Sequence, residues 1–221
     1  MRLIYRGVDP AEFPHNYQPT DAWRQAFFAA HPRAAGQRLL TLPGRITRIK
    51  GHTDFLHLLA RLKQQGVAVH GLLVGGEDPR RRQYADEIRA LIRELKLEDD
   101  ITLTGHRSDI REVLSLSHAV LSLSSKPESF GRTVLESLNL GVPVVGYAHG
   151  GVGEILTDLF PTGAIPLGDQ ARLTHVAADL FSRDRAIVPP VTSYQLATML
   201  SQTLAVYEQL ASREANGRSE P

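Results

Sequence analysis

The chain has 221 residues, a formal net charge of +1 and no cysteine. This length allows one large α/β domain or two small domains. A near-neutral charge gives no electrostatic reason to expect nucleic acid as a partner, and the lack of cysteine excludes disulfides and thiolate metal sites. Residues 1–20 lack the apolar core of a signal peptide, and no apolar run reaches membrane-spanning length. We therefore expect a cytoplasmic protein.

Short apolar runs alternate along the chain with amphipathic stretches. After an irregular, proline-rich start, Thr20 or Asp21 caps a first helix. Strands are predicted at residues 39–43, 67–74, 101–104, 119–123, 142–147 and 163–167. Helices are predicted between them, near residues 53–65, 80–96, 109–117, 131–140, 151–157 and 170–182. A last helix is expected over residues 191–211, followed by a flexible tail at residues 212–221.

Most of the predicted strands are nearly continuous apolar runs, which is typical of parallel strands covered on both faces. Strands that alternate with helices through short connections indicate βαβ units. The sequence therefore predicts an α/β domain over residues 20–190, with a Rossmann-like, doubly wound parallel sheet of about six strands. In such sheets ligands bind beyond the carboxyl ends of the strands, so the loops that follow the strands are candidate sites.

The loop "LPGRITRIKGH" follows the first predicted strand. Gly44 ends the strand, Arg45 comes next, and Lys50 precedes Gly51. Two cations flanked by glycines can approach a diphosphate closely, Arg as a planar fork and Lys as a point charge. A solvated basic loop would have the same composition, so this loop alone does not establish a phosphate site.

Two further loops carry glycines at strand ends. Gly75 and Gly76 close the second strand and allow either the close approach of a ligand or a tight turn. They lack the G-x-G-x-x-G spacing of a dinucleotide site, so we predict no NAD binding from them. Gly105 ends the third strand, and His106 and Arg107 follow it at the same sheet edge. A histidine in such a loop serves either in catalysis or as a loop hydrogen-bonding group.

The stretch "KPESFGRTVLESLNLGVPVV" follows the fourth strand. If a helix begins near Gly131, the free N–H groups of Gly131, Arg132 and Thr133 form an anion site. Glu128 precedes that site and Glu136 lies inside the helix, so both can face one elongated ligand. Carboxylates do not bind phosphate but accept hydrogen bonds from hydroxyls, as a nucleotide sugar would supply at both ends. The alternative is a surface ion pair for Glu136 and a loop carboxylate for Glu128.

Together these segments resemble the donor-binding half of a family 4 glycosyltransferase with the GT-B fold. The resemblance extends from about Leu3 to Asp158. "GRITRIKG" resembles the G-R-x-x-x-x-K-G loop of the family, and "ESFGRTVLE" is similar to its E-x7-E motif. "GVPVVGYAHGGVGEIL" resembles the segment that follows, including Gly150, Gly151 and Glu154.

The resemblance implies a retaining transfer from a nucleoside diphosphate sugar, with UDP as the expected nucleotide and GDP next. It assigns the diphosphate to Arg45 and Lys50, the sugar hydroxyls to Glu128 and the ribose diol to Glu136. It implies catalytic roles for Arg45, Lys50 and Glu128. The implied donor-binding residues are Gly44, Gly75, Gly76, Arg107, Ser129, Phe130, Gly131, Arg132, Thr133 and Glu136. We expect no metal and no cofactor, since the nucleotide sugar is a substrate.

Members of the family have a further domain before this one, which contributes the acceptor site. Residues 1–19 contain "LIYRGVDPAEF", which resembles the hinge between the two halves, so we interpret the chain as a C-terminal half without its acceptor domain. We expect it to transfer no sugar alone, and the resemblance allows for peripheral membrane association of the full-length enzyme. The alternative functions are a non-catalytic nucleotide-sugar binding module, one subunit of a two-chain transferase, and a sugar-nucleotide epimerase.

Overall fold

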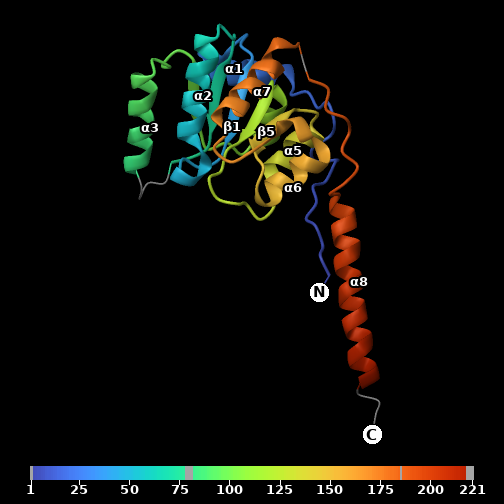
Figure 1. The fold of residues 1–221 in the computed structure, drawn as a ribbon. Coiled ribbons are helices and arrows are strands. Elements are labelled where there is room, and N and C mark those ends of the chain that lie inside the picture. The colour runs from blue at the N-terminus through green and yellow to red at the C-terminus, as the bar shows by residue number, and fades with distance from the viewer. Residues whose placement is uncertain (1, 78–81, 185, 218–221) are drawn as a thin grey trace.

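A computed structural model describes residues 2–77, 82–184 and 186–217, and it confirms the predicted α/β class. Six parallel strands form one sheet in the order β3-β2-β1-β4-β5-β6 (Figure 1). The strands are β1 (Leu39–Pro43), β2 (His70–Val74), β3 (Ile101–Gly105), β4 (Ala119–Ser122), β5 (Val144–Tyr147) and β6 (Ala164–Ile165). The order reverses between β1 and β4, as in a doubly wound sheet.

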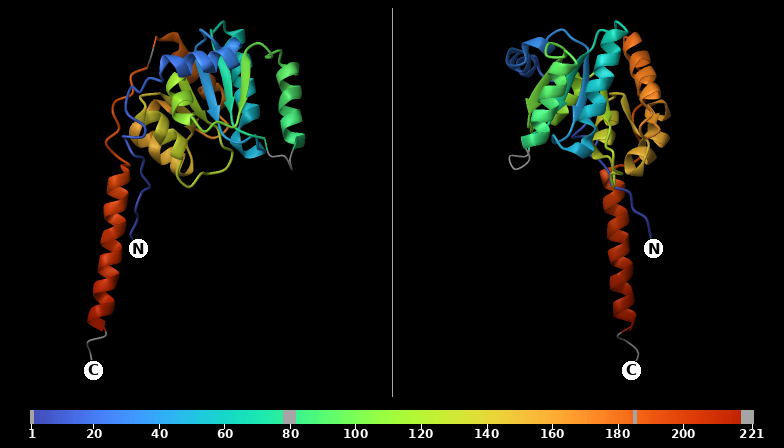
Figure 2. Two further views of the ribbon diagram at one scale, coloured as in Figure 1. Left: turned by 180° about the vertical axis from the view of Figure 1, so that it is seen from behind. Right: turned by 60° about the vertical axis from the view of Figure 1, so that its left-hand side comes forward.

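Helices cover both faces of the sheet (Figure 2). They are α1 (Asp21–Ala30), α2 (His52–Gln64), α3 (Arg82–Glu94), α4 (Ile110–Leu116), α5 (Arg132–Asn139), α6 (Gly150–Leu159), α7 (Gln170–Ser182) and α8 (Leu196–Gly217). One core joins α2, α3 and α7 to the sheet, and the cores on the opposite face involve α1, α4, α5 and α6. Alternate residues of a strand point to opposite faces of the sheet. Leu40 and Leu42 point to the core formed with α2, α3 and α7, and Leu39 points to a core on the opposite face. Both faces are therefore apolar, as the continuous runs in the sequence indicate.

Some predicted boundaries are wrong for local reasons. β2 begins at His70 rather than at residue 67, because the N–H of Val67 donates to the carbonyl of Leu62 and closes the end of α2. Gly163 belongs to a short 3₁₀ turn, which shortens β6 to two residues. α3 is described from Arg82, so the predicted helix start at residues 80–81 lies outside the described residues.

The predicted final helix over residues 191–211 is displaced toward the C-terminus. α8 begins at Leu196 because the segment before it pairs with the N-terminal segment, where Val8 donates to Tyr194 and accepts from Leu196. The helix continues to Gly217, so it includes residues assigned from sequence to a tail. α8 extends away from the sheet, with the N-terminal segment on the same side (Figures 1 and 2).

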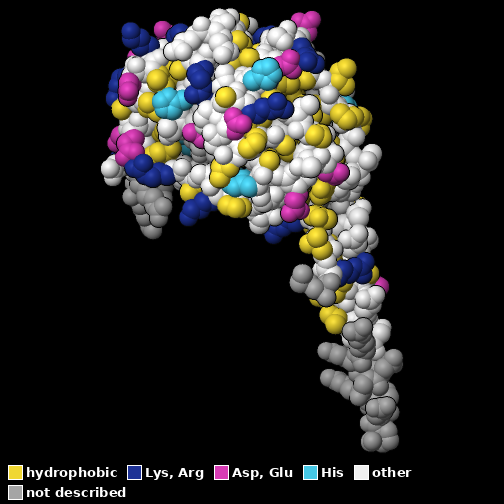
Figure 3. Space-filling view, in the orientation of Figure 1, with side chains coloured by type: hydrophobic (Ala, Val, Ile, Leu, Met, Phe, Trp, Pro, Cys, Tyr) yellow, Lys and Arg dark blue, Asp and Glu magenta, His cyan; other side chains and the backbone are white. Residues whose placement is uncertain are grey.

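Hydrophobic side chains lie along the exposed surface of α8 (Figure 3). Leu200, Leu204, Tyr207 and Leu210 are between 50% and 66% exposed. None of the helices in the described part of the chain combines the length and the hydropathy that a membrane span requires.

The loop after β1 packs tightly against the end of β4 at Gly51. Gly51 has a φ of +77°, and a Cβ there would lie 2.1 Å from the carbonyl oxygen of Leu123. Gly66 has a similar φ of +73° but open space around its missing side chain. An alanine at Gly66 therefore tests backbone strain alone, whereas an alanine at Gly51 tests backbone strain and steric overlap together.

We predict that Gly66→Ala lowers the free energy of unfolding by about 1–2 kcal/mol, the cost of a left-handed residue with a Cβ. Gly51→Ala adds the displacement of the Leu123 carbonyl and should cost about 2–5 kcal/mol in total. Urea unfolding of the two variants measures the difference. Equal losses of unfolding free energy in the two variants would show that β4 and the loop shift to accept the Cβ at no energetic cost.

Candidate functional site

The candidate site lies at the carboxyl ends of β1 and β4, where the strand order reverses. Two adjoining hollows form a crevice there, the larger of about 220 Å³, and both are lined by Pro43, Lys50 and Thr133. The first hollow is also lined by Val120, Leu121, Ser122, Glu128, Gly131 and Val134. The second is also lined by Gly44, Arg45, Val74, Gly75, Gly76, His106, Arg107 and Ile110. The fold thus joins all four loops named from the sequence.

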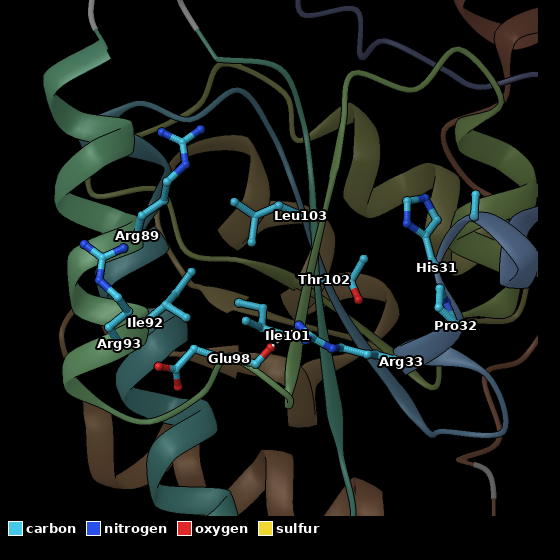
Figure 4. A pocket seen from close by; sticks show the side chains of 11 residues that line it. His31, Pro32, Arg33, Arg89, Ile92, Arg93, Glu98, Ile101, Thr102 and Leu103 are labelled. Carbon is cyan, nitrogen blue, oxygen red and sulfur yellow. Dashed lines mark hydrogen bonds between the residues drawn. The ribbon is translucent and has the colours of Figure 1, made fainter.

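A larger hollow of about 700 Å³ lies elsewhere, beside the edge strand β3 (Figure 4). Arg89 and Arg93 of α3 flank it on one side, and His31 and Arg33 flank it on the other. It is open to solvent along the side of β3, away from the point where the strand order reverses. We therefore place the candidate site in the smaller crevice, where the cations and the start of α5 meet.

Main-chain hydrogen bonds attach the loop after β1 to the end of β2. The N–H of Gly44 donates to Val74 at 2.9 Å, and the N–H of Ile46 donates to Gly76 at 3.0 Å. A Cβ at Gly75 would lie 2.0 Å from the carbonyl oxygen of Gly44. The double glycine therefore allows two loops to pack together, and this packing sets the position of Arg45.

Lys50 and Glu128 form an ion pair across the crevice. The Lys50 Nζ lies 2.7 Å from a Glu128 carboxylate oxygen, and both side chains are about 30% exposed (31% and 29%). The N–H of Gly151, in the first turn of α6, donates to the main-chain carbonyl of Glu128 and holds this loop. The cation predicted for the diphosphate and the carboxylate predicted for the sugar therefore neutralise each other in this structure. Arg45 is exposed and has no ion-pair partner among the described residues.

Glu136 forms an ion pair with Arg132, whose Nε lies 2.6 Å from the carboxylate. The Glu136 side chain is only 7% exposed, whereas Arg132 is 69% exposed. Burial raises the pKa of Glu136, and Arg132 opposes that rise. Glu136 does not line either hollow, so its contact with a ribose stays a prediction. Of the other predicted residues, Phe130 packs in the core and Ser129 is exposed.

Arg107 lines the crevice, and contacts with Asp109 and Phe27 fix its side chain. Its guanidinium donates twice to Asp109, with the Nε at 2.8 Å, and lies 5.5 Å from the ring centre of Phe27. The indole N–H of Trp23 donates to the same carboxylate at 2.8 Å. Helix α1 therefore supports this edge of the crevice, which the sequence did not indicate because Trp23 and Asp109 are far apart in the chain.

His52, the first residue of α2, lies directly behind the loop that carries Arg45 and Lys50. It is fully buried, and burial lowers its pKa from 6.5 to about 4. The edge of the Tyr84 ring packs near it, with ring centres 6.1 Å apart. His52 was not predicted from the sequence as part of the site. Its only signal was its place after Gly51, in the first turn of a helix that begins at the candidate site.

No group of three or more His, Cys, Asp or Glu side chains in the described ranges is placed to hold a metal ion. The crevice is lined instead by two cations, Arg45 and Lys50, and by the start of α5. This arrangement can bind an anion through charge and N–H groups together.

Because His52 is neutral when folded, acid should destabilise the protein. Below about pH 6.5 the unfolded chain takes up a proton at His52, whereas the folded chain does so only near pH 4. This contribution to stability is complete above pH 6.5 and is lost as the pH falls toward 4. His31 and His70, whose pKa values burial also lowers, act in the same direction.

We predict that His52→Phe reduces the pH dependence of the unfolding free energy between pH 6.5 and 4 by up to about 1.4 kcal/mol per pH unit. Urea unfolding at several pH values in this range measures the slope for both proteins. Parallel slopes would show that His52 titrates equally in the folded and unfolded states.

The sequence has relatives among glycosyltransferases. It is 28% identical over 192 residues to a 2-deoxystreptamine N-acetyl-D-glucosaminyltransferase of Streptomyces fradiae. The matched region covers 83% of this chain and 45% of that protein. It is 31% identical over 159 residues to the mannosylfructose-phosphate synthase of Agrobacterium fabrum. Here the matched region covers 69% of this chain and 33% of that protein. The chain therefore spans less than half the length of either relative.

Solved structures share the fold of this chain. A glycosyltransferase from Rickettsia africae has a TM-score of 0.79 at 24% identity, covering 94% of this chain and 56% of that chain. The HepE protein of Anabaena, in complex with UDP and glucose, has a TM-score of 0.72 at 22% identity, covering 97% and 56%. The model of the family described as glycosyl transferases group 1 matches residues 24–181. Because this match covers well over half of the sequence, the chain belongs to the group 1 glycosyl transferases.

Proposed function

We propose that this chain is the donor-binding half of a retaining family 4 glycosyltransferase and that it binds a UDP-linked sugar in the crevice between β1 and β4. One observation carries the proposal. Arg45 and Lys50, from the loop after β1, meet the N-terminal end of α5 at the point where the strand order reverses. Both cations and the free N–H groups of a helix start favour a bound diphosphate.

The same groups suit the chemistry of sugar transfer. When the bond between the sugar and the diphosphate breaks, negative charge develops on the leaving nucleoside diphosphate. Arg45, Lys50 and the first N–H groups of α5 offset that charge, which lowers the barrier. Because these groups supply the positive charge, we propose that the site works without a divalent metal.

Donor binding in this proposal requires an exchange of partners at Lys50. Lys50 turns from Glu128 to the diphosphate, and Glu128 then accepts hydrogen bonds from the sugar hydroxyls. An ion pair as exposed as this one contributes only about 0–1 kcal/mol, so the exchange costs little. Binding of the diphosphate and recognition of the sugar are thereby coupled through one pair.

UDP is proposed as the donor nucleotide because HepE of Anabaena, which shares the fold, is described in complexes with UDP and with UDP-glucose. We propose that the acceptor site belongs to a further domain, as in full-length members of the family, and that this chain alone transfers no sugar. A non-catalytic nucleotide-sugar binding module would bind the same ligands. Turnover measured with the chain joined to an acceptor domain separates the two functions.

The matched pair Arg45→Ala and Arg48→Ala tests the proposal. Both arginines lie in the loop after β1, but Arg48 is paired with Glu87 at 2.7 Å and does not line the crevice. Loss of a charge-assisted hydrogen bond should weaken UDP binding by Arg45→Ala by about tenfold or more. Arg48→Ala should bind UDP as the unchanged protein does.

Isothermal titration calorimetry with UDP, GDP and ADP, each with and without EDTA, measures these affinities. Equal losses in the two variants would mean that only the net charge of the loop matters. No binding of any nucleoside diphosphate by the unchanged protein would contradict the proposed function.

Substitutions of Glu128 and of Glu136 should change the ligand affinities in different ways. Glu128→Gln releases Lys50, so we expect UDP affinity to rise by about twofold to fivefold, the worth of a partly exposed ion pair, while the added preference for UDP-glucose over UDP falls. If Glu136 binds the ribose, Glu136→Ala should lower the affinities for UDP and for UDP-glucose by similar factors. The same calorimetry on both variants measures this. A loss of UDP affinity in Glu128→Gln would show that the carboxylate does not compete for Lys50.

A further inference from the structure

Arg107 is bound at the crevice by a carboxylate that a tryptophan of α1 also binds. Asp109 accepts from the Arg107 Nε at 2.8 Å and from its Nη2 at 2.5 Å. The indole N–H of Trp23 donates to the same carboxylate at 2.8 Å. Burial by itself would raise the pKa of Asp109, but the hydrogen bonds from Arg107 and Trp23 lower it, so the carboxylate is ionised at neutral pH. Charge-assisted bonds to two donors fix the orientation of this carboxylate.

Asp109 occupies the N-cap position of α4 but does not cap the helix. Its side chain accepts no hydrogen bond from the first turn of α4. Aspartate is one of the residues that usually cap a helix at this position, and a cap contributes about 1 kcal/mol. The carboxylate is directed to Arg107 and Trp23 instead, so contacts between distant parts of the chain determine where it points.

Trp23 is itself fixed in the first turn of α1. The Thr20 hydroxyl accepts from the main-chain N–H of Trp23 and caps the helix. The indole stacks on Phe27, with ring centres 5.1 Å apart and an angle of 16° between the planes. The Arg107 guanidinium lies 5.5 Å from the centre of the same ring, which is 2% exposed. Asp109 therefore fixes one edge of the guanidinium, and Phe27 supports it from the core.

The remaining nitrogen of Arg107 is available to a ligand. Its Nη1 has no hydrogen-bond partner among the residues that the structure describes. The side chain lines the same hollow as Arg45 and Lys50. A guanidinium has five N–H donors in a fixed plane, so a pair through Nε and Nη2 leaves the two N–H groups of Nη1 directed elsewhere. Asp109 therefore orients Arg107 without occupying all of its donors, whereas the Lys50 ammonium is a point charge that Glu128 engages directly.

We propose that Trp23 is a positioning residue for the nucleotide site and that it acts through Asp109 on Arg107. The indole N–H fixes the carboxylate, the carboxylate fixes the guanidinium, and the guanidinium presents Nη1 to an oxygen of the bound nucleoside diphosphate. This inference rests on the proposed function, because it needs a nucleoside diphosphate in the hollow that Arg107 lines. It makes α1 part of the binding site, although α1 carries none of the loops that follow the strands.

Trp23→Phe tests the inference, because it keeps an aromatic ring beside Phe27 and removes the indole N–H. Arg107→Ala should lower the affinity for UDP by about tenfold, the worth of one charge-assisted hydrogen bond, and Trp23→Phe should lower it by about threefold to fivefold. The double variant identifies the route. If Trp23 acts through Arg107, Trp23→Phe should cause no further loss of affinity once Arg107 is alanine. A side chain that only supports packing would cause the same loss in both backgrounds.

Asp109→Asn gives a second test in which the direction of the change is informative. If Asp109 orients Arg107, removal of its charge should lower the affinity for UDP by about threefold to fivefold. If Asp109 only competes with the ligand, the affinity should rise, as we expect for Glu128→Gln.

Tyr17→Phe is the matched control. The Tyr17 hydroxyl donates to Glu112 at 3.1 Å, Glu112 accepts from the Arg111 Nη2 at 2.7 Å, and Arg111 lies 4.4 Å from the centre of the Tyr17 ring. This arrangement is also attached to α4, but Arg111 lines neither hollow of the crevice. Trp23→Phe and Tyr17→Phe should both melt at lower temperatures than the unchanged protein, and Tyr17→Phe should bind UDP normally. Differential scanning calorimetry and titration calorimetry with UDP measure the two properties.

Four results would overturn the inference and leave the proposed function, which depends on Arg45 and Lys50. They are UDP binding by Trp23→Phe or Arg107→Ala as tight as that of the unchanged protein, tighter binding by Asp109→Asn, equal losses of affinity in Trp23→Phe and Tyr17→Phe, and a loss from Trp23→Phe that persists without Arg107. If the unchanged protein binds no nucleoside diphosphate, the proposed function fails, and this inference fails with it.

Discussion

The site depends on one junction, where the loop after β1 is attached to its neighbours on both sides. Two main-chain hydrogen bonds, from Gly44 and Ile46, join it to the end of β2. Contact of Gly51 with the Leu123 carbonyl joins it to the end of β4. β1 lies between β2 and β4, so this loop spans the point where the strand order reverses. Parallel pairing brings the strand ends to one edge, and the junction sets the two cations above that edge.

The charges around the crevice are largely paired in this structure. Lys50 is paired with Glu128, and Arg132 with the buried Glu136. Exposed or half-exposed pairs contribute little to stability, so a ligand with its own charges can replace one partner at small cost. A buried carboxylate is different, because breaking its pair leaves an unpaired charge in a medium of low polarity. The two glutamates therefore have different freedom to bind a ligand.

Much of the fold could be predicted from local pattern. Continuous apolar runs such as residues 119–123 indicate strands covered on both faces, and their alternation with helices indicates a parallel sheet. The start of α5 next to Gly131 was also predictable, because it follows from the local sequence. The start of α8 was not, because the pairing of Val8 with Gln195 joins opposite ends of the chain.

The sequence by itself determined the sheet, the loops at its carboxyl edge and the basic residues of the first loop, since these follow from hydrophobic periodicity and from glycines beside strand ends. Only the tertiary structure decided which charges meet. Lys50 and Glu128 are distant in sequence, and their ion pair exists because β1 and β4 are neighbours in the sheet. Trp23 reaches Asp109 because α1 and α4 share one face of the sheet. The burial of His52 likewise depends on packing between the loop and α3, and side-chain burial is a property of neighbours that the local sequence does not contain.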